Sequence, residues 1–178
     1  MKLIALTGLP RCGKDTVAAW LIAHHSWTKL AFAGPLKAAA AILLNRTEDE
    51  CNGVNFDREA VMPEWGFSMR WFLQVFGTEC LRNQVAQDFW IKRMYIELGS
   101  WTPMAKIVIT DCRFENEAAL VRERGGHVIE IRRPGLVGSG HISDAGVRLT
   151  EDDYVILNDG TVDDLYEQTR RLAACWDV

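Results

Sequence analysis

Short runs of apolar and β-branched residues recur along the chain, separated by segments whose apolar positions follow helical spacing. The runs predict buried parallel strands, at residues 2–7, 28–33, 106–110, 127–132 and 153–157. The intervening periodicity predicts helices, at Lys14–His25, Pro35–Leu44, and about 68–82, 84–98, 114–124 and 161–175. Strands that alternate with helices are typical of a parallel sheet with helices on both faces. The pattern therefore predicts a three-layer α/β fold.

Two long connections interrupt this alternation. The first is an insertion between the second and third predicted strands, expected at about residues 34–100. Within it, residues 45–66 are polar and lack periodicity, so they are predicted to form a loop. The second is a Gly-rich loop that opens at Pro134-Gly135 and is predicted to be a lid over about 133–150. With 178 residues, the chain is expected to be one domain, 1–178, that includes both the insertion and the lid.

Composition argues against several classes of protein. The net charge of −4 disfavours binding of nucleic acid. No apolar run approaches the ~20 residues of a membrane-spanning helix, so no membrane association is expected. The 5 cysteines include no Cys-x-x-Cys pair, which argues against a zinc site and for a reducing, cytoplasmic location. Arginines nevertheless cluster locally, as in Arg122, Arg124, Arg132 and Arg133, and local positive charge in an acidic protein suits a pocket for a small anion better than a nucleic-acid duplex.

The first predicted strand runs into the segment Gly8-Leu9-Pro10-Arg11-Cys12-Gly13-Lys14, which then opens the first predicted helix. G-x-x-x-x-G-K is the spacing of a phosphate-binding loop. Glycines permit a tight turn whose N–H groups point at phosphate oxygens, and the helix N-terminus adds a partial positive charge. Lys14 is expected to reach the β- and γ-phosphates of ATP. An ordinary Gly-rich turn is the alternative, but the strand-loop-helix context favours nucleotide binding.

Three oxygen-bearing side chains are candidates for binding Mg²⁺. Asp15 takes the position after the lysine, where the motif usually has Ser or Thr, and Thr16 follows it. Asp15 could contact Mg²⁺ through water or bind the substrate side, while Thr16 could bond the α-phosphate. Asp111 follows an apolar strand, and ligands bind at the carboxyl ends of such strands. It could hold magnesium's water or accept the acceptor's proton; a helix N-cap is the alternative.

Two arginines outside the loop are candidates for holding phosphate groups. Arg113 could clamp a phosphate with two hydrogen bonds, or it could pair with Glu117 one helical turn later. Arg133, with Arg132 before it, precedes the predicted lid. Phosphoryl transfer requires cations over the transferred group, and a lid can deliver them while excluding water. A solvated basic pair is the alternative.

The insertion carries charged and aromatic residues of less specific meaning. Asp57, Arg58 and Arg70 could contact an acceptor nucleotide, although charged residues on loops and helix starts are usually solvated. Trp71 and Trp90 could stack on a base, but aromatic residues at helical spacing more often belong to a hydrophobic core. Both interpretations stay open for each residue.

Taken in order, these segments resemble the phage-type deoxynucleoside monophosphate kinases over nearly the whole chain. The matching stretches are LTGLPRCGKDT at 6–16, LAFAGPLKAA at 30–39, FDRE at 56–59, RWFLQVFGTE at 70–79, FWIKRM at 89–94, TDCRFENEA at 110–118, VIEIRRPG at 128–135, HISDAG at 141–146 and VILNDGTVDDL at 155–165. The GKDT form belongs to the family pattern, so Asp15 is a family trait. The segment between FDRE and Arg70 is short for the family.

The resemblance implies a P-loop kinase fold and transfer of the ATP γ-phosphate, with Mg²⁺, to a deoxynucleoside 5′-monophosphate. The implied ATP-phosphate and magnesium site consists of Gly8, Arg11, Cys12, Gly13, Lys14, Asp15 and Thr16. The implied acceptor side consists of Lys37, Asp57, Arg58, Arg70, Asp111 and Arg113. Arg133 falls at the lid, and Asn158 and Asp159 fall where related kinases hold adenine. Because related enzymes are often homodimers, the resemblance allows a homodimer.

Two rival functions remain at this point. A kinase of another small acceptor, such as dephospho-coenzyme A, would share the phosphate loop and the Asn158-Asp159-Gly160 turn. A regulatory module would bind ATP without acceptor-dependent turnover. A switch GTPase is disfavoured because the chain has no Asn-Lys-x-Asp motif.

Overall fold

A computed structural model describes residues 1–138 and 146–175. The chain divides into two compact units, which are described separately. The α/β unit comprises Met1–Ala31 and Tyr95–Val178, and the inserted unit comprises Phe32–Met94. Across the described ranges, none of the helices combines the length and apolar composition that crossing a bilayer requires.

The α/β unit is built on a five-stranded parallel sheet in the order β2-β5-β1-β6-β7. Its strands are β1 (Lys2–Thr7), β2 (Thr28–Leu30), β5 (Lys106–Ile109), β6 (His127–Arg132) and β7 (Tyr154–Leu157). The central strands are apolar at nearly every position, because a sheet with both faces covered buries both sets of side chains. The predicted parallel sheet is confirmed, and β1 lies at its centre.

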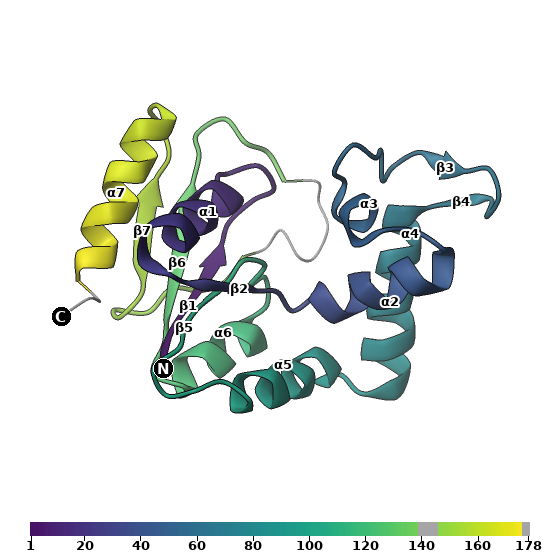
Figure 1. Cartoon of the computed structure of the whole chain (residues 1–178), viewed down its shortest axis with the longest axis horizontal. Coiled ribbons are helices and arrows are strands. Elements are labelled where there is room, and N and C mark those ends of the chain that lie inside the picture. The colour runs from purple at the N-terminus through teal and green to yellow at the C-terminus, as the bar shows by residue number, and fades with distance from the viewer. Residues whose placement is uncertain (139–145, 176–178) are drawn as a thin grey trace. The chain divides into compact units, whose positions relative to one another are not determined.

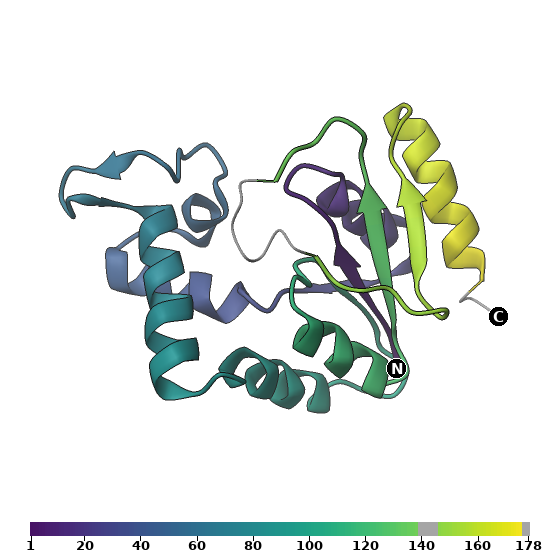
Figure 2. The same cartoon turned by 180° about the vertical axis from the view of Figure 1, so that it is seen from behind.

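Three helices cover the sheet: α1 (Lys14–His25), α6 (Glu115–Glu123) and α7 (Val162–Ala174). The chain moves along the sheet in one direction through β1-α1-β2 and in the other through β5-α6-β6. Because parallel crossovers are right-handed, α1 and α6 cover opposite faces. Helix α7 packs with α1 (Figures 1 and 2). The core that these helices form with the sheet includes Leu6, Leu21 and Leu165. Helices on both faces are as predicted.

The inserted unit is mainly helical. It contains α2 (Gly34–Leu44), α3 (Glu48–Asn52), α4 (Met69–Gln74), the π-helical segment η1 (Val75–Val85) that continues α4, and the antiparallel pair β3 (Val61–Met62) and β4 (Phe67–Ser68). Its core gathers Ala40, Leu44, Cys51, Met62 and Met69. Helix α5 (Phe89–Gly99) begins in this unit and ends in the α/β unit.

The prediction of a loop over 45–66 is wrong, because this segment contains α3, β3 and the turn into β4. The N-terminus of α3 is closed by a reciprocal cap. The Glu50 N–H donates to Thr47 Oγ1 (3.2 Å), and the Thr47 N–H donates to the Glu50 carboxylate (2.8 Å). The strand predicted at 28–33 ends earlier, at Leu30, because Phe32 is a buried residue of the inserted unit.

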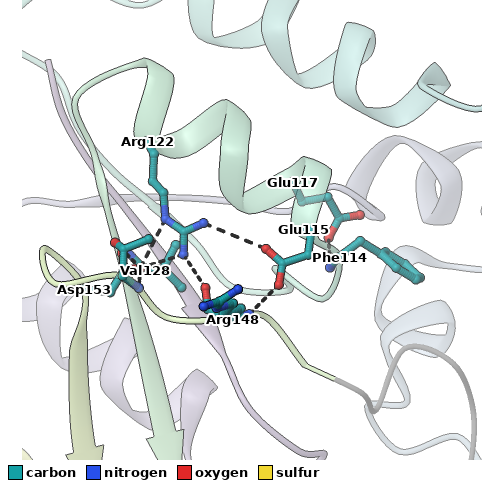
Figure 3. A network of polar contacts seen from close by, with 8 residues as sticks. Phe114, Glu115, Glu117, Arg122, Val128, Arg148 and Asp153 are labelled. Carbon is teal, nitrogen blue, oxygen red and sulfur yellow. Dashed lines mark hydrogen bonds and ion pairs between the residues drawn. The ribbon is translucent and has the colours of Figure 1, made fainter.

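A polar network fastens the segment that enters β7 to α6 and β6 (Figure 3). The Asp153 side chain, 1% exposed, accepts hydrogen bonds from Arg122 Nη2 (2.6 Å) and from the N–H groups of Val128 and Thr150 (2.8 Å each). Arg122 also donates to the Arg148 carbonyl (2.9 Å), and the Arg148 N–H donates to Glu115. Burial alone would raise the pKa of Asp153, but these hydrogen bonds outweigh it and hold the pKa below its ordinary value.

Candidate active site

The loop between β1 and α1 has the backbone of a phosphate-binding turn. Gly8 (φ 123°), Arg11 (φ 64°) and Gly13 (φ 114°) all lie in the left-handed region. A Cβ on Gly8 would collide with the carbonyl oxygen of Ile131 on β6, so no other residue fits there. The loop follows the carboxyl end of the central strand, the point where the connections of the sheet reverse direction and where ligands bind in such sheets.

Lys14, the first residue of α1, lies over this loop. Its ammonium group donates hydrogen bonds to the carbonyl oxygens of Gly8 and Leu9, each at 2.8 Å. The Sγ atom of the buried Cys12 lies 3.5 Å from the same nitrogen. A full positive charge is therefore fixed at the N-terminus of a helix, a combination that favours binding of phosphate groups.

A cavity of about 260 Å³ opens beside the loop in the α/β unit. Its lining residues come from the loop, the start of α1, the residue after β6, the turn after β7 and the start of α7: Arg11, Gly13, Lys14, Asp15, Thr16, Arg133, Asn158, Gly160, Val162 and Leu165. Figure 2 shows the strands β6 and β7 ending at the edge of the sheet where the loop lies. Three cationic side chains and one carboxylate line the cavity, so it suits a polyanion with an attached apolar group.

Asp15 and Thr16 both line this cavity. The Asp15 side chain is 85% exposed, and its Oδ1 atom lies 3.0 Å from Lys29 Nζ on β2. Carboxylate and hydroxyl oxygens are the ligand types that Mg²⁺ prefers, so these residues fit the metal that a phosphate-binding loop requires. Lys29 could not be identified from the sequence, because it stands as an isolated charge in a predicted strand.

Asp111 and Arg113 follow β5, which pairs with β1, at the same edge of the sheet as the phosphate loop. Neither is among the residues that line the cavity. The alternative of an N-cap at Asp111 is wrong, because α6 begins at Glu115 and the buried Glu117 closes its N-terminus. The Glu117 carboxylate accepts the backbone N–H groups of Arg113 (2.8 Å) and Phe114 (3.2 Å).

The four arginines that are clustered in the sequence do not meet at one site in the structure. Arg122 is bound to Asp153, the Arg124 guanidinium lies 4.1 Å from the centre of the Tyr95 ring, and Arg132 pairs with Glu130 (2.6 Å). Arg133 lines the cavity together with Arg11 and Lys14. Arg122 and Arg124 lie at the end of α6, whereas Arg132 ends β6 and Arg133 follows it. Of the predicted lid, 133–150, residues 139–145 lie outside the described residues.

Asn158 and Asp159 differ in position although they are adjacent. The Asn158 side chain donates from Nδ2 to the Cys12 carbonyl (2.8 Å), and the residue lines the cavity. Asp159 is exposed and is not among the lining residues. Val162 and Leu165 of α7 add apolar surface to the cavity.

The charged candidates of the inserted unit lie around α3 and the start of α4. Lys37 Nζ donates to Asn52 Oδ1 (2.8 Å), and the Arg70 N–H donates to the Arg58 carbonyl (2.9 Å). The Arg70 guanidinium pairs with Glu59, while the Asp57 carboxylate accepts the Glu59 N–H (2.9 Å). Arg58 and Arg70 are therefore brought side by side by main-chain contact within this unit.

The two tryptophan candidates have different environments. Trp71 is 52% exposed and contacts the Phe67 ring, whose centre lies 5.1 Å away. Trp90 is 7% exposed, and its indole N–H donates to the Gly77 carbonyl (3.0 Å). Trp90 is therefore a core residue, which was the alternative to base stacking. The Trp71 ring is exposed to solvent.

Comparison with known proteins agrees with this geometry. The family deoxynucleotide monophosphate kinase matches the chain over residues 2–65 and 61–169. The chain belongs to the deoxynucleotide monophosphate kinase family. This kinase resembles the deoxynucleotide monophosphate kinase of Enterobacteria phage T4, with 24% identity over 237 residues, covering 96% of this chain and 98% of the phage protein. A protein of Acanthamoeba polyphaga mimivirus is 32% identical over 181 residues, covering 94% of each chain.

Two further comparisons concern length and fold. The two parts of the family match meet at 61–65, in the β3–β4 hairpin, where the sequence predicted a segment short for the family. The crystal structure of TT1252 from Thermus thermophilus is similar in fold, with a TM-score of 0.51, 20% identity, and coverage of 97% of this chain and 96% of that one. The family membership makes this α/β protein a kinase.

The backbone of Arg11 provides a test of the loop. A left-handed conformation costs an arginine roughly 1 kcal/mol that glycine does not bear. Glycine also has more backbone entropy in the unfolded chain, so Arg11→Gly should raise the free energy of unfolding by less than about 1 kcal/mol. Phosphoryl transfer should fall at least tenfold, since a cation leaves the cavity. Denaturant titration and steady-state kinetics measure the two effects. Unchanged kinetics would show that the side chain has no part in the reaction.

Proposed function

We propose that this kinase transfers the γ-phosphate of ATP to a deoxynucleoside 5′-monophosphate, giving the diphosphate and ADP. The observation that carries the proposal is the cavity beside the phosphate loop, where Arg11, Lys14 and Arg133 surround space for a polyphosphate. Val162 and Leu165 offer apolar contact at the same cavity, which suits an attached nucleoside. The named relatives supply the acceptor class, because the enzymes of phages T4 and RB69 are deoxynucleotide monophosphate kinases.

On the donor side, the residues have separate roles in this proposal. The N–H groups of the loop from Gly8 through Cys12 to Gly13 bind the phosphates of ATP, and Lys14 contacts the β- and γ-phosphates. Asp15, Thr16 and Asp111 are the oxygen donors that would hold Mg²⁺, which neutralises charge on the β- and γ-phosphates when bound. Arg133 stabilises negative charge on the transferred group. Asn158 and Asp159 belong to the nucleoside end.

On the acceptor side, cations and aromatic surface are required. Arg113 with Asp111 in the α/β unit is proposed to act on the acceptor phosphate. The proposed contacts from the inserted unit are Lys37, Asp57, Arg58, Arg70 and Trp71. Trp90 is 7% exposed, so it is too buried to stack on a base. A phosphate monoester has its second pKa near ~6, so the acceptor is already ionised at neutral pH and no strong general base is needed.

An acceptor screen tests the proposal. ADP release with ATP and Mg²⁺ is measured in the presence of each deoxynucleoside monophosphate, each ribonucleoside counterpart and dephospho-coenzyme A. We expect turnover with one or more deoxynucleotides. Turnover with dephospho-coenzyme A alone would replace the acceptor class, and ATP binding without acceptor-dependent turnover would replace the enzyme by a regulatory module.

A further inference from the structure

Asn158 contacts the phosphate loop itself. Its Nδ2 atom donates to the carbonyl oxygen of Cys12 at 2.8 Å, across 146 positions of sequence. Its own N–H donates to the Arg132 carbonyl at 2.7 Å, which extends the pairing of β6 with β7 by one residue. The backbone of Asn158 is therefore held by the sheet, and this fixes the position from which its side-chain amide extends.

The Cys12 carbonyl belongs to the peptide bond that enters Gly13. In a planar trans peptide the C=O and the following N–H point in opposite directions. The hydrogen bond from Asn158 consequently fixes the Gly13 N–H so that it points away from the amide of Asn158. Gly13 has no Cβ to restrict rotation of this peptide plane, so the loop's own residues do not fix its direction.

Close packing adds a second constraint at the same place. A Cβ on Gly13 would lie only 2.8 Å from Asn158 Nδ2 and 3.2 Å from a methyl group of Leu165. Asn158 and Leu165 thus pack closely against Gly13, the loop residue with the fewest backbone restrictions. The loop and the turn after β7 form one assembled surface in the α/β unit.

We propose that Asn158 is a positioning residue for the phosphates of the donor nucleotide, acting through the orientation of the Cys12–Gly13 peptide. The inference rests on the proposed function. It assigns Asn158 a role on the phosphates in addition to its place at the nucleoside end. When the amide donor is lost, the Cys12 carbonyl is free to turn toward the phosphates, and a carbonyl oxygen repels them.

Asn158→Asp tests this role, because it keeps the shape of the side chain and replaces the donor by a carboxylate that repels the Cys12 carbonyl. Inorganic tripolyphosphate and ADP serve as inhibitors competing with ATP, since the first has phosphates without a base. We expect both inhibition constants and the KM for ATP to rise about tenfold, with the KM for the acceptor unchanged. Asn116→Asp makes the same chemical change at an exposed position of α6 and should alter none of them.

The outcomes separate the alternatives. If ADP binding weakens and tripolyphosphate binding does not, the amide acts on the nucleoside and the inference is overturned; unchanged binding of both also overturns it. If the wild-type protein phosphorylates no acceptor, the proposed function fails, and calorimetric titration with ADP and tripolyphosphate still tests the role of Asn158. The aspartate also adds a negative charge to the cavity that Asn158 lines, and this charge alone would weaken phosphate binding. Asn158→Ala removes the donor without adding charge, so the inference requires both inhibition constants to rise in this variant too, and unchanged constants would overturn it.

Discussion

Replacing Lys14 with alanine should lower kcat/KM for phosphoryl transfer by roughly a thousandfold while leaving the protein folded. The ammonium group is held by the carbonyl oxygens of Gly8 and Leu9, so its charge is already directed at the phosphate-binding loop. A preorganised charge of this kind stabilises the transition state without reorganisation. The fold depends on the apolar core around α1 and the sheet, to which this side chain adds little.

Steady-state kinetics with the acceptor identified in the screen measure the effect, and circular dichroism with thermal unfolding checks the fold. Lys92→Ala is a matched control, because Lys92 is an exposed lysine of α5 that pairs with Asp88. Its activity should equal that of the wild type. A Lys14→Ala variant with near-normal turnover would remove Lys14 from the mechanism.

Replacing Asp153 with alanine should lower the free energy of unfolding by about 3 kcal/mol. The substitution leaves Arg122 without its buried partner and removes the acceptor for the N–H groups of Val128 and Thr150. Unpaired polar groups at buried positions retain their full cost of desolvation. Chemical denaturation at neutral pH measures the loss.

The effect of Asp153 should depend on pH in one direction. Because its pKa in the folded protein lies below that of the unfolded chain, the carboxylate contributes its full stability above the unfolded-state pKa. This contribution is lost as the pH falls through the folded-state pKa, so the difference between wild type and Asp153→Ala should shrink in acid. Asp152→Ala, at an exposed neighbour, should change stability by less than about 0.5 kcal/mol at any pH. A pH-independent difference would mean that the ion pair is not its source.

The sheet could be predicted from the sequence because buried parallel strands consist of nearly continuous apolar runs. The bounds predicted for residues 2–7 and 127–132 are those of β1 and β6. The inserted unit was predicted less well, since its elements are short and their stability comes from packing with each other. The α3 helix had a local signal, the Thr47-x-x-Glu50 cap, but its five residues are too few for a visible period.

The candidate site, too, could be predicted only in part from the sequence. The phosphate loop is contiguous, so Lys14, Asp15 and Thr16 could be identified by spacing, and they line the cavity. Contacts between distant segments left no such signal: the pairing of Lys29 with Asp15 and of Asn158 with Cys12 depends on the order of the strands. The four arginines that are close in sequence have different surroundings in the structure, because proximity in sequence does not specify where a side chain points.

The order β2-β5-β1-β6-β7 has a consequence for how the chain can fold as it is made. Strand β1 leaves the ribosome long before its partners, because within the described residues it pairs with β5 and β6, which begin at Lys106 and His127. Until those residues are synthesised, the phosphate loop has no scaffold, and pairing over such separations is slow. The inserted unit has contacts that are close in sequence, so it can gain structure earlier. Nascent chains that end before residue 106 should therefore contain helices but no central sheet.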